Sequence, residues 1–206
     1  MKKFLTAVAV AIITATPAMA QERAAFVGPR VEALVGYDRL IGPRTRATIG
    51  PLTVLEASVG QDGLAYGIGA GYDFRVGRVI LGLEAEYADS NIDGCEAGFI
   101  STTDRMCASA RRDLYVGGRA GVAVAASTLL YVKAGYTNAR VALDYTEPAF
   151  PVANFRRTDN RDGVRVGVGV EQKLGSNLYA KAEYRYSDYE GWDERHQVLA
   201  GLGVRF

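Results

Sequence analysis

A strict two-residue alternation between Gly63 and Phe74 is the feature that most constrains how this chain folds. Its apolar positions are Leu64, Tyr66, Ile68, Ala70, Tyr72 and Phe74, and Ala65, Gly67, Gly69, Gly71 and Asp73 lie between them. Successive side chains of a strand point to opposite faces, so this segment has one apolar face and one face of small residues. Glycine weakens a strand and is kept where other groups approach closely, as they do inside a small barrel. The segment therefore predicts a strand in the wall of a narrow barrel.

The same alternation recurs along the chain. The further segments are 29–38, 79–89, 112–124, 129–145, 163–173, 178–189 and 196–206. Most have the roughly 9–11 residues that a tilted membrane-spanning strand needs. A soluble sandwich also alternates, but its second face meets water and should be polar and bulky. Here that face mixes glycines with both charge signs, and several apolar faces end in tyrosine. We therefore expect an all-β fold, an eight-stranded antiparallel up-and-down transmembrane β-barrel.

The connections between these segments alternate in length. The short ones are 75–78, 125–128 and 173–177, and the long ones are 39–63, 90–111, 146–162 and 190–195. Outer-membrane barrels have short periplasmic turns and longer extracellular loops, which is the same arrangement. The first long loop contains several apolar residues, so we expect part of it to extend the strands above the membrane.

The N-terminal residues have the pattern of a secretory signal peptide. Lys2 and Lys3 precede an apolar run over 4–13, Pro17 follows that run, and small residues lead to Ala20. The run is shorter than the ~20 residues of a membrane-spanning helix. We expect residues 1–20 to be removed by cleavage after Ala20, leaving 21–206 as one outer-membrane barrel domain.

The charge balance restricts the function. The chain has 24 Lys and Arg against 23 Asp and Glu, so it has no excess of positive charge for binding nucleic acid. Beyond the N-terminal segment no apolar run approaches ~18 residues, which excludes membrane-spanning helices.

The alternation also places a set of charged side chains inside the barrel. They are Glu32, Asp73, Glu84, Glu86, Asp113, Arg119, Lys133, Arg165, Glu171, Lys181, Glu183, Arg185 and Arg205. Charges in a narrow interior are costly unless paired, and the two signs are nearly balanced. We therefore expect an internal network of ion pairs and hydrogen bonds. The alternative is a gated polar path or proton relay, whereas a wide pore is not expected because side chains normally fill so small a barrel.

The two cysteines, Cys95 and Cys107, fall in the second long loop. In the oxidising cell envelope such a pair most simply forms a disulfide, and the chain-entropy model gives about 3 kcal/mol for a loop of this length. Two thiolates without a nearby histidine make a poor metal site. We expect the disulfide and no metal.

The single histidine, His196, limits the case for an enzyme. Some small outer-membrane barrels are lipid A acyltransferases or deacylases that use a histidine with a serine or an acid, and Ser187 and Asp188 are near in sequence. However, His196 has the parity of the lipid-facing side, and no recognisable triad surrounds it. We expect no enzymatic activity and assign no catalytic or cofactor-binding residue.

Candidate contact residues for an extracellular ligand lie in the last two long loops. They are Phe150, Phe155, Arg156, Arg157, Arg161 and Trp192. Exposed aromatic residues beside arginine could contact a host, phage or polysaccharide ligand. The arginines could equally pair with lipopolysaccharide phosphates.

The chain resembles small outer-membrane β-barrel proteins of the opacity-protein and surface-antigen type, which are common in alphaproteobacteria and are grouped with the porin family. The resemblance rests on Gly63-Leu64-Ala65-Tyr66-Gly67, Gly71-Tyr72-Asp73-Phe74, Leu129-Leu130-Tyr131-Val132-Lys133-Ala134-Gly135-Tyr136, Gly169-Val170-Glu171, the segment 178–186 and the terminal Phe206. It implies an outer-membrane location and an assembly signal that includes Phe206, read by the barrel-assembly machinery.

The resulting functional expectation is an envelope-structural and surface-interaction role, adhesin-like or antigen-like. A narrow channel for small solutes or ions is the alternative, and a lipid A-modifying enzyme is less favoured. The expected partners are outer-membrane lipid, lipopolysaccharide, the assembly machinery and an extracellular ligand bound by the loops. We expect a monomer without a cofactor.

Overall fold

A computed structural model describes residues 26–41, 45–49, 53–57, 60–98, 102–190 and 193–206. The elements are β1 (Gly28–Ile41), β2 (Thr45–Ile49), β3 (Thr53–Ala57), β4 (Gly60–Val76), β5 (Val79–Ser90), β6 (Asp93–Ala97), β7 (Arg105–Ala125), β8 (Thr128–Thr146), the 3-10 turn η1 (Pro151–Ala153), β9 (Phe155–Lys173), β10 (Leu178–Tyr189) and β11 (Asp193–Arg205). In these ranges no helix is long and apolar enough to cross a membrane.

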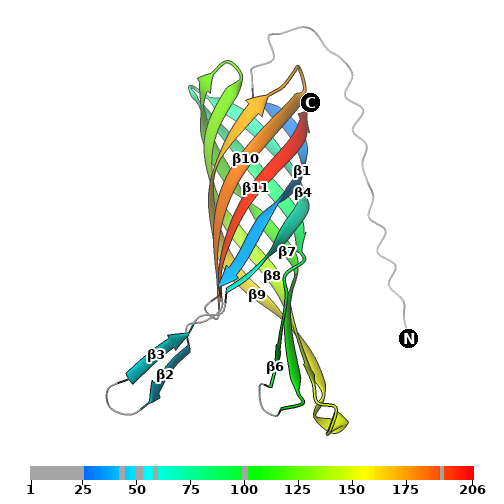
Figure 1. Cartoon of the computed structure of the whole chain (residues 1–206). Coiled ribbons are helices and arrows are strands. Elements are labelled where there is room, and N and C mark those ends of the chain that lie inside the picture. Colours follow the sequence, from blue (N-terminus) through cyan, green and yellow to red (C-terminus); the bar gives the residue numbers. More distant parts are fainter. Residues whose placement is uncertain (1–25, 42–44, 50–52, 58–59, 99–101, 191–192) are drawn as a thin grey trace, which may run out of the picture.

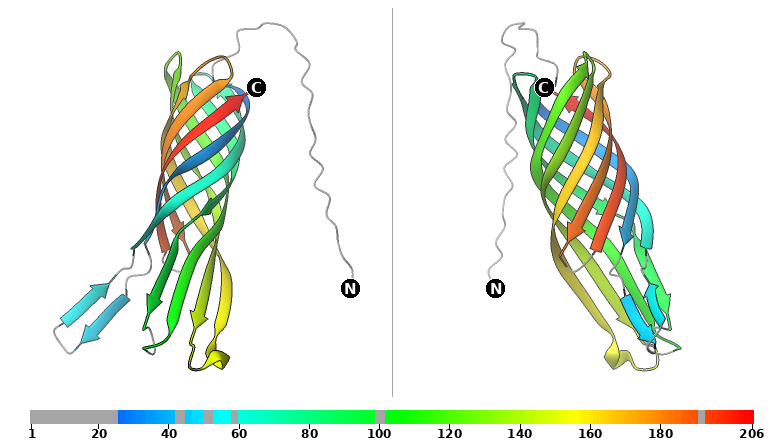
Figure 2. Two further views of the ribbon diagram at one scale, coloured as in Figure 1. Left: turned by 45° about the vertical axis from the view of Figure 1, so that its right-hand side comes forward. Right: turned by 90° about the vertical axis from the view of Figure 1, so that its left-hand side faces the viewer.

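The main strands form an antiparallel ring (Figures 1 and 2). β1 pairs with β4 on one side and with β11 on the other, and β5 joins β4 to β7. The pairs β7–β8, β8–β9, β9–β10 and β10–β11 complete the circuit. A closed ring satisfies its backbone hydrogen bonds between strands, as hydrocarbon surroundings require. The expected all-β antiparallel ring is confirmed.

The strands at the loop end differ from the sequence prediction, and two of the expected loops are wrong. Segment 90–111 contains β6 and the first part of β7, and segment 146–162 contains the first part of β9. Together with the loop-end part of β8, which belongs to the expected strand 129–145, they form a sheet beyond the ring (Figure 2). The pairing of β7 with β8 is irregular between Ala110 and Asp113, where the extension begins. The first part of β9, residues 155–162, is almost entirely polar, so the sequence there lacks the apolar alternation that marks the ring strands.

The first and last long loops also differ from the expected ranges. Both ends of the first long loop extend the ring strands as expected, since β1 continues to Ile41 and pairs there with the start of β4 at Gly60. The hairpin β2–β3 within the loop forms a separate sheet. The last long loop, expected over 190–195, is shorter because β11 begins at Asp193.

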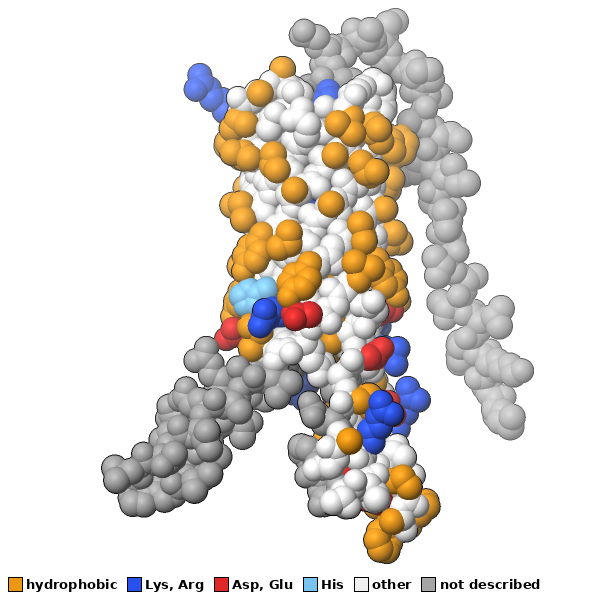
Figure 3. Space-filling view, in the orientation of Figure 1, with side chains coloured by type: hydrophobic (Ala, Val, Ile, Leu, Met, Phe, Trp, Pro, Cys, Tyr) orange, Lys and Arg blue, Asp and Glu red, His pale blue; other side chains and the backbone are white. Residues whose placement is uncertain are grey.

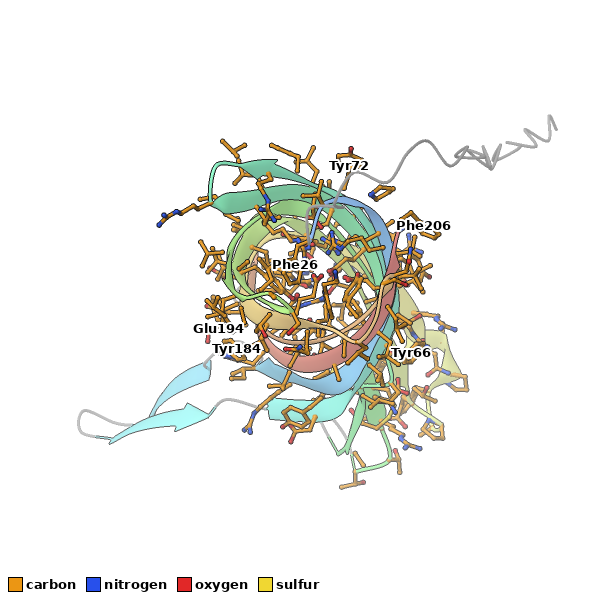
Figure 4. The ribbon with its side chains drawn as sticks, turned by 90° about the horizontal axis from the view of Figure 1, so that it is seen from above. Phe26, Tyr66, Tyr72, Tyr184, Glu194 and Phe206 are labelled. Atoms are coloured by element: carbon orange, nitrogen blue, oxygen red, sulfur yellow. A yellow bond between two sulfur atoms is a disulfide. The ribbon has the colours of Figure 1, made fainter. Side chains whose placement is uncertain are left out.

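The outer surface of the ring is apolar, as the alternation predicts. Ile68 is 64% exposed and Leu83 is 69% exposed, and Figure 3 shows apolar side chains spread over this face of the ring. Tyr66 and Tyr72 lie six positions apart on β4 and point outward (Figure 4). Aromatic residues toward both ends of an apolar band are typical of the two membrane interfaces.

Inward-facing glycines make room for inward-facing tyrosines. Tyr131 lies directly opposite Gly169 across the β8–β9 pair, and a Cβ added to Gly169 would lie 2.5 Å from the tyrosine Cζ. Tyr179 lies in the same way opposite Gly203. Tyr115 packs on Gly135, where an added Cβ would lie 2.9 Å from Cε2. At these positions the absence of a glycine side chain leaves room for a tyrosine ring in the interior, and at Gly69 and Gly82 it leaves room for charged side chains.

A small apolar cluster closes the turn end of the ring. Phe26, Ile80 and Leu129 are almost fully buried and pack together, and Figure 4 shows Phe26 inside the ring. Phe26 has a positive φ of 70°, a conformation that is uncommon for a residue other than glycine. At this bend, just before β1, the Phe26 side chain points into the turn end of the barrel.

Candidate functional site: the charged interior and the outer extension

The interior of the ring holds buried carboxylates and buried cations in equal number. The carboxylates are Glu32, Asp38, Asp73, Glu84, Glu86, Asp113, Glu171 and Glu183, and the cations are Arg30, Arg119, Lys133, Arg165, Lys181, Arg185, Arg195 and Arg205. All are at most 8% exposed. Their formal charges cancel, which lowers the electrostatic cost of placing so many ions in a narrow space.

The layer of charges nearest the turn end is built around Asp73. Arg119 donates to both carboxylate oxygens, at 2.8 and 2.6 Å, and Arg30 and Arg205 donate at 3.1 and 2.6 Å. Arg205 and Arg119 also reach Glu171, at 2.6 and 3.1 Å. These residues come from β1, β4, β7, β9 and β11, so the layer connects strands across the ring.

The middle layer is built around two lysines. The Lys133 ammonium lies 2.7 Å from Glu86 and 3.2 Å from Glu183. Lys181 lies 2.6 Å from Glu32 and 3.1 Å from Glu183. Arg185 pairs with Glu183 and with Glu86, where the distance is 2.9 Å. Each carboxylate in this layer has more than one cationic neighbour.

The third layer, nearest the loops, is built around Asp113. Its carboxylate pairs with Arg165, accepts from Arg195 at 3.0 Å and accepts from the Thr137 hydroxyl at 2.7 Å. Arg195 also donates to Asp38 at 2.8 Å. Together the three layers occupy the interior along the ring.

Tyrosine rings fill the space between the layers and carry cations on their faces. The cation-to-centroid distances are 4.4 Å for Lys133 over Tyr115, 5.0 Å for Arg119 over Tyr131 and 5.4 Å for Arg205 over Tyr179. The Tyr131 and Tyr179 hydroxyls donate to Glu183 and Glu32, at 2.5 and 2.7 Å. Cation–π contacts strengthen when they are desolvated, so these rings add to the ion pairs.

His196 lies outside the ring with aromatic neighbours. Its Nδ1 is 2.8 Å from the Tyr184 hydroxyl, and its ring centroid is 5.2 Å from that of Tyr186. Ser187 faces inward and accepts from Arg165 at 2.8 Å. The wall therefore separates Ser187 from His196, and this geometry does not form a serine–histidine pair.

The structure contains the disulfide between Cys95 and Cys107. The two residues are directly opposite each other on β6 and β7. The bond fixes β6, the short edge strand of the extension, to the longer strand beside it.

The expected ligand-contact residues lie mostly on a strand and not in a loop, which corrects the sequence prediction. Phe155 stacks on Tyr145 with ring centroids 5.4 Å apart. Arg156 pairs with Asp144 at 3.2 Å. Arg157 likewise pairs with Asp159 at 2.9 Å, and Arg161 donates to the Glu190 carbonyl at 3.4 Å. Phe150 lies beside η1, while Trp192 is outside the described residues.

Comparison with known proteins identifies the family. A family model described as outer membrane protein beta-barrel domain matches residues 6–206. The chain belongs to this family. A 22 kDa outer membrane protein of Rhizobium leguminosarum bv. viciae is 29% identical over 164 residues, which cover 71% of this chain and 70% of the relative. The protein is therefore located in the cell outer membrane.

Two solved structures show the same fold. Neisserial surface protein A has a TM-score of 0.54 and 15% identity, over 87% of this barrel and 97% of that chain. The attachment invasion locus protein of Yersinia pestis, in complex with the heparin analogue sucrose octasulfate, has a TM-score of 0.50 and 12% identity, over 87% and 99%.

The structure places every inner charge named from the sequence in the interior of this outer-membrane barrel, and it adds three. Arg30 and Asp38 have the same parity as Glu32, so the alternation contained the signal for both. Arg195 fell in an expected loop and was missed for that reason. Phe26 precedes the first alternating segment and had no periodic signal.

Proposed function

We propose that the protein is an eight-stranded barrel that spans the outer membrane and presents its outer extension, formed by β6 and the loop-end parts of β7, β8 and β9, to partners outside the cell. The ring pairings of β1, β4, β5 and β7 to β11 support the strand number. The observation that carries the surface role is the extension itself. Three ring strands continue past the ends of their neighbours and hold exposed aromatic and arginine side chains there.

The test of this role is to shorten the extension without opening the ring. Ala142 and Thr158 are opposite partners, so removing 143–157 and joining these two residues by Asn-Gly leaves a closed hairpin. Bacteria that display the shortened barrel should lose binding to host cells or immobilised polysaccharides. A barrel lacking the hairpin over 45–57 is the matched control and should still bind. Heat-dependent gel mobility checks that each variant folds. Equal binding by the shortened barrel, or no binding by the unaltered protein, would refute the role.

The filled interior argues against the channel alternative. Three ion-paired layers and three inward tyrosines lie across the path that a solute would take. Planar-bilayer recording of the pure protein should give no reproducible conductance steps. For the lipid A alternative, the positions of Ser187 and His196 on opposite faces of the wall count against catalysis. Mass analysis of lipid A from a deletion strain should show unchanged acylation.

The processing and assembly steps are also proposals. We propose cleavage after Ala20, a segment that lies outside the described residues, and N-terminal sequencing of the mature protein tests it. Phe206 is 59% exposed at the end of β11, a position that suits recognition by the assembly machinery. We further propose a monomer that contacts lipid and lipopolysaccharide through its outer face.

A further inference from the structure

The outer extension ends in an exposed apolar tip, residues 148–153, and the proposed surface role does not name the kind of partner that this tip contacts. All six residues, Pro148 to Ala153, are apolar and exposed, with Phe150 at 68% and Val152 at 96%. Figure 3 shows apolar side chains gathered at the end of the molecule farthest from the ring. Proteins seldom expose a contiguous apolar patch to water unless it contacts a partner or a membrane.

The tip is a turn in which several backbone N–H groups have partners within the turn. The Glu147 N–H donates to the Asn154 side chain at 2.6 Å, and the Ala149 N–H donates to the Glu147 carboxylate at 3.0 Å. The Ala153 N–H donates to the Phe150 carbonyl at 2.9 Å. Pro148 and Pro151 have no N–H group. Few N–H groups would therefore lose hydrogen bonds to water if the tip entered hydrocarbon.

The charges behind the tip are nearly balanced and fit a lipid headgroup layer. Arg156 and Arg157 follow the tip at the start of β9, with side chains that are 68% and 71% exposed. Their partners, Asp144 and Asp159, offset their charge. Arginine next to an apolar projection is typical of residues at a membrane interface, where the cation meets phosphate. The balance favours a partner whose own surface is close to neutral.

The position of the tip lets it reach an opposing membrane. The tip is convex and lies at the far end of the extension (Figure 1). Tyr136 is the last outward-facing tyrosine on the ring part of β8, and the strand continues for ten residues from there to Thr146. At ~3.3 Å per residue this continuation is about 33 Å long. We propose that the tip inserts into the headgroup–acyl boundary of an opposing phospholipid membrane. This inference deepens the proposed surface role and rests on it.

The test uses the full protein held in amphipol and mixed with phosphatidylcholine vesicles, with and without phosphatidylserine. The unaltered protein should float with both kinds of vesicle, with little dependence on phosphatidylserine or salt. The variant Phe150→Ser with Val152→Ser should lose about tenfold or more in partition coefficient, because two apolar side chains no longer leave water. Leu174→Ser, at an exposed apolar residue in a turn at the opposite end, is the matched control and should float like the unaltered protein.

A second variant reports the depth of insertion. Val152→Trp should show blue-shifted fluorescence and quenching by brominated lipid when vesicles are added, relative to the unaltered protein with its own Trp192. Equal flotation of the double-serine variant, or a Val152→Trp signal that vesicles leave unchanged, would overturn the proposal. If the double-serine variant loses binding to cells while the unaltered protein ignores vesicles, the membrane inference fails and the surface role survives. If shortening the extension leaves cell binding intact, the surface role itself fails.

Discussion

Removing the carboxylate of Asp73 should destabilise the barrel more than removing any single arginine that it binds. Asp73 accepts hydrogen bonds from Arg30, Arg119 and Arg205, all buried. Asp73→Ala leaves these guanidinium groups without their shared partner. Breaking a buried ion pair from one side typically costs about 3–5 kcal/mol, because an uncompensated charge remains. We expect a loss in that range in the free energy of unfolding.

Removal of one arginine from the same layer is the comparison for Asp73→Ala. Arg205→Gln removes one donor from Asp73 and one from Glu171, but Arg119 still contacts both carboxylates. We expect a loss of about half the Asp73 value, since no carboxylate is left without a cation.

The assay is urea unfolding of the protein refolded into lipid vesicles, followed by heat-dependent gel mobility. Asp62→Ala is the matched control, because Asp62 is 55% exposed, pairs with Arg39 at 3.7 Å and accepts a hydrogen bond from the exposed Tyr37 hydroxyl. An exposed pair contributes about 0–1 kcal/mol, so this control should unfold almost as the unaltered protein does. An Asp73→Ala loss no larger than the Asp62→Ala loss would refute the description of the layer as a mutually dependent ion network.

Three further predictions follow from the same structure. Gly169→Val should lower the free energy of unfolding in the urea assay by about 1–3 kcal/mol, because the valine side chain meets the Tyr131 ring. Gly118→Ala should be tolerated, since an added Cβ there has its nearest neighbour at 3.5 Å. Equal losses in the two variants would contradict the close packing of Tyr131 against Gly169. Cys107→Ser should speed proteolysis of the extension while leaving barrel mobility unchanged, and slower or equal cleavage would contradict a clamping role for the disulfide. Phe26→Ser should lower the free energy of unfolding by about 2–4 kcal/mol through loss of a buried aromatic side chain. The variant should still give no conductance in planar bilayers, because the charged layers remain. Reproducible current steps would disprove the sealed interior.

The ring and its interior were predictable from the sequence because lipid and a narrow interior impose opposite demands on alternate residues. The segment around Tyr66 shows this, since its apolar positions face outward and its glycines face inward. The same parity gave the buried positions of Asp73 and Glu171, although it could not show that three arginines share Asp73. Those partners come from strands far apart in sequence, and only the closure of the ring brings them together.

The outer extension was not predictable in the same way. Between Arg105 and Ala110, β7 lacks the branched aliphatic residues, tyrosines and glycines that mark the ring strands. The alternation that identifies ring strands is therefore weak there, although β8 and β9 continue to pair. The sequence shows that the tip contains an aromatic residue, Phe150, but the exposure of its side chain depends on the turn that contains η1.

The seam between the first and last strands of the ring has a consequence for biogenesis. The Phe206 N–H donates to the Pro29 carbonyl at 2.9 Å, and Arg205 supplies a cation to both Asp73 and Glu171. A chain without β11 would therefore have two open sheet edges and would lack one of the cations that contact Asp73 and Glu171. Both defects disappear only when β11 pairs with β1, so the seam makes the presence of β11 a physical condition for a stable barrel.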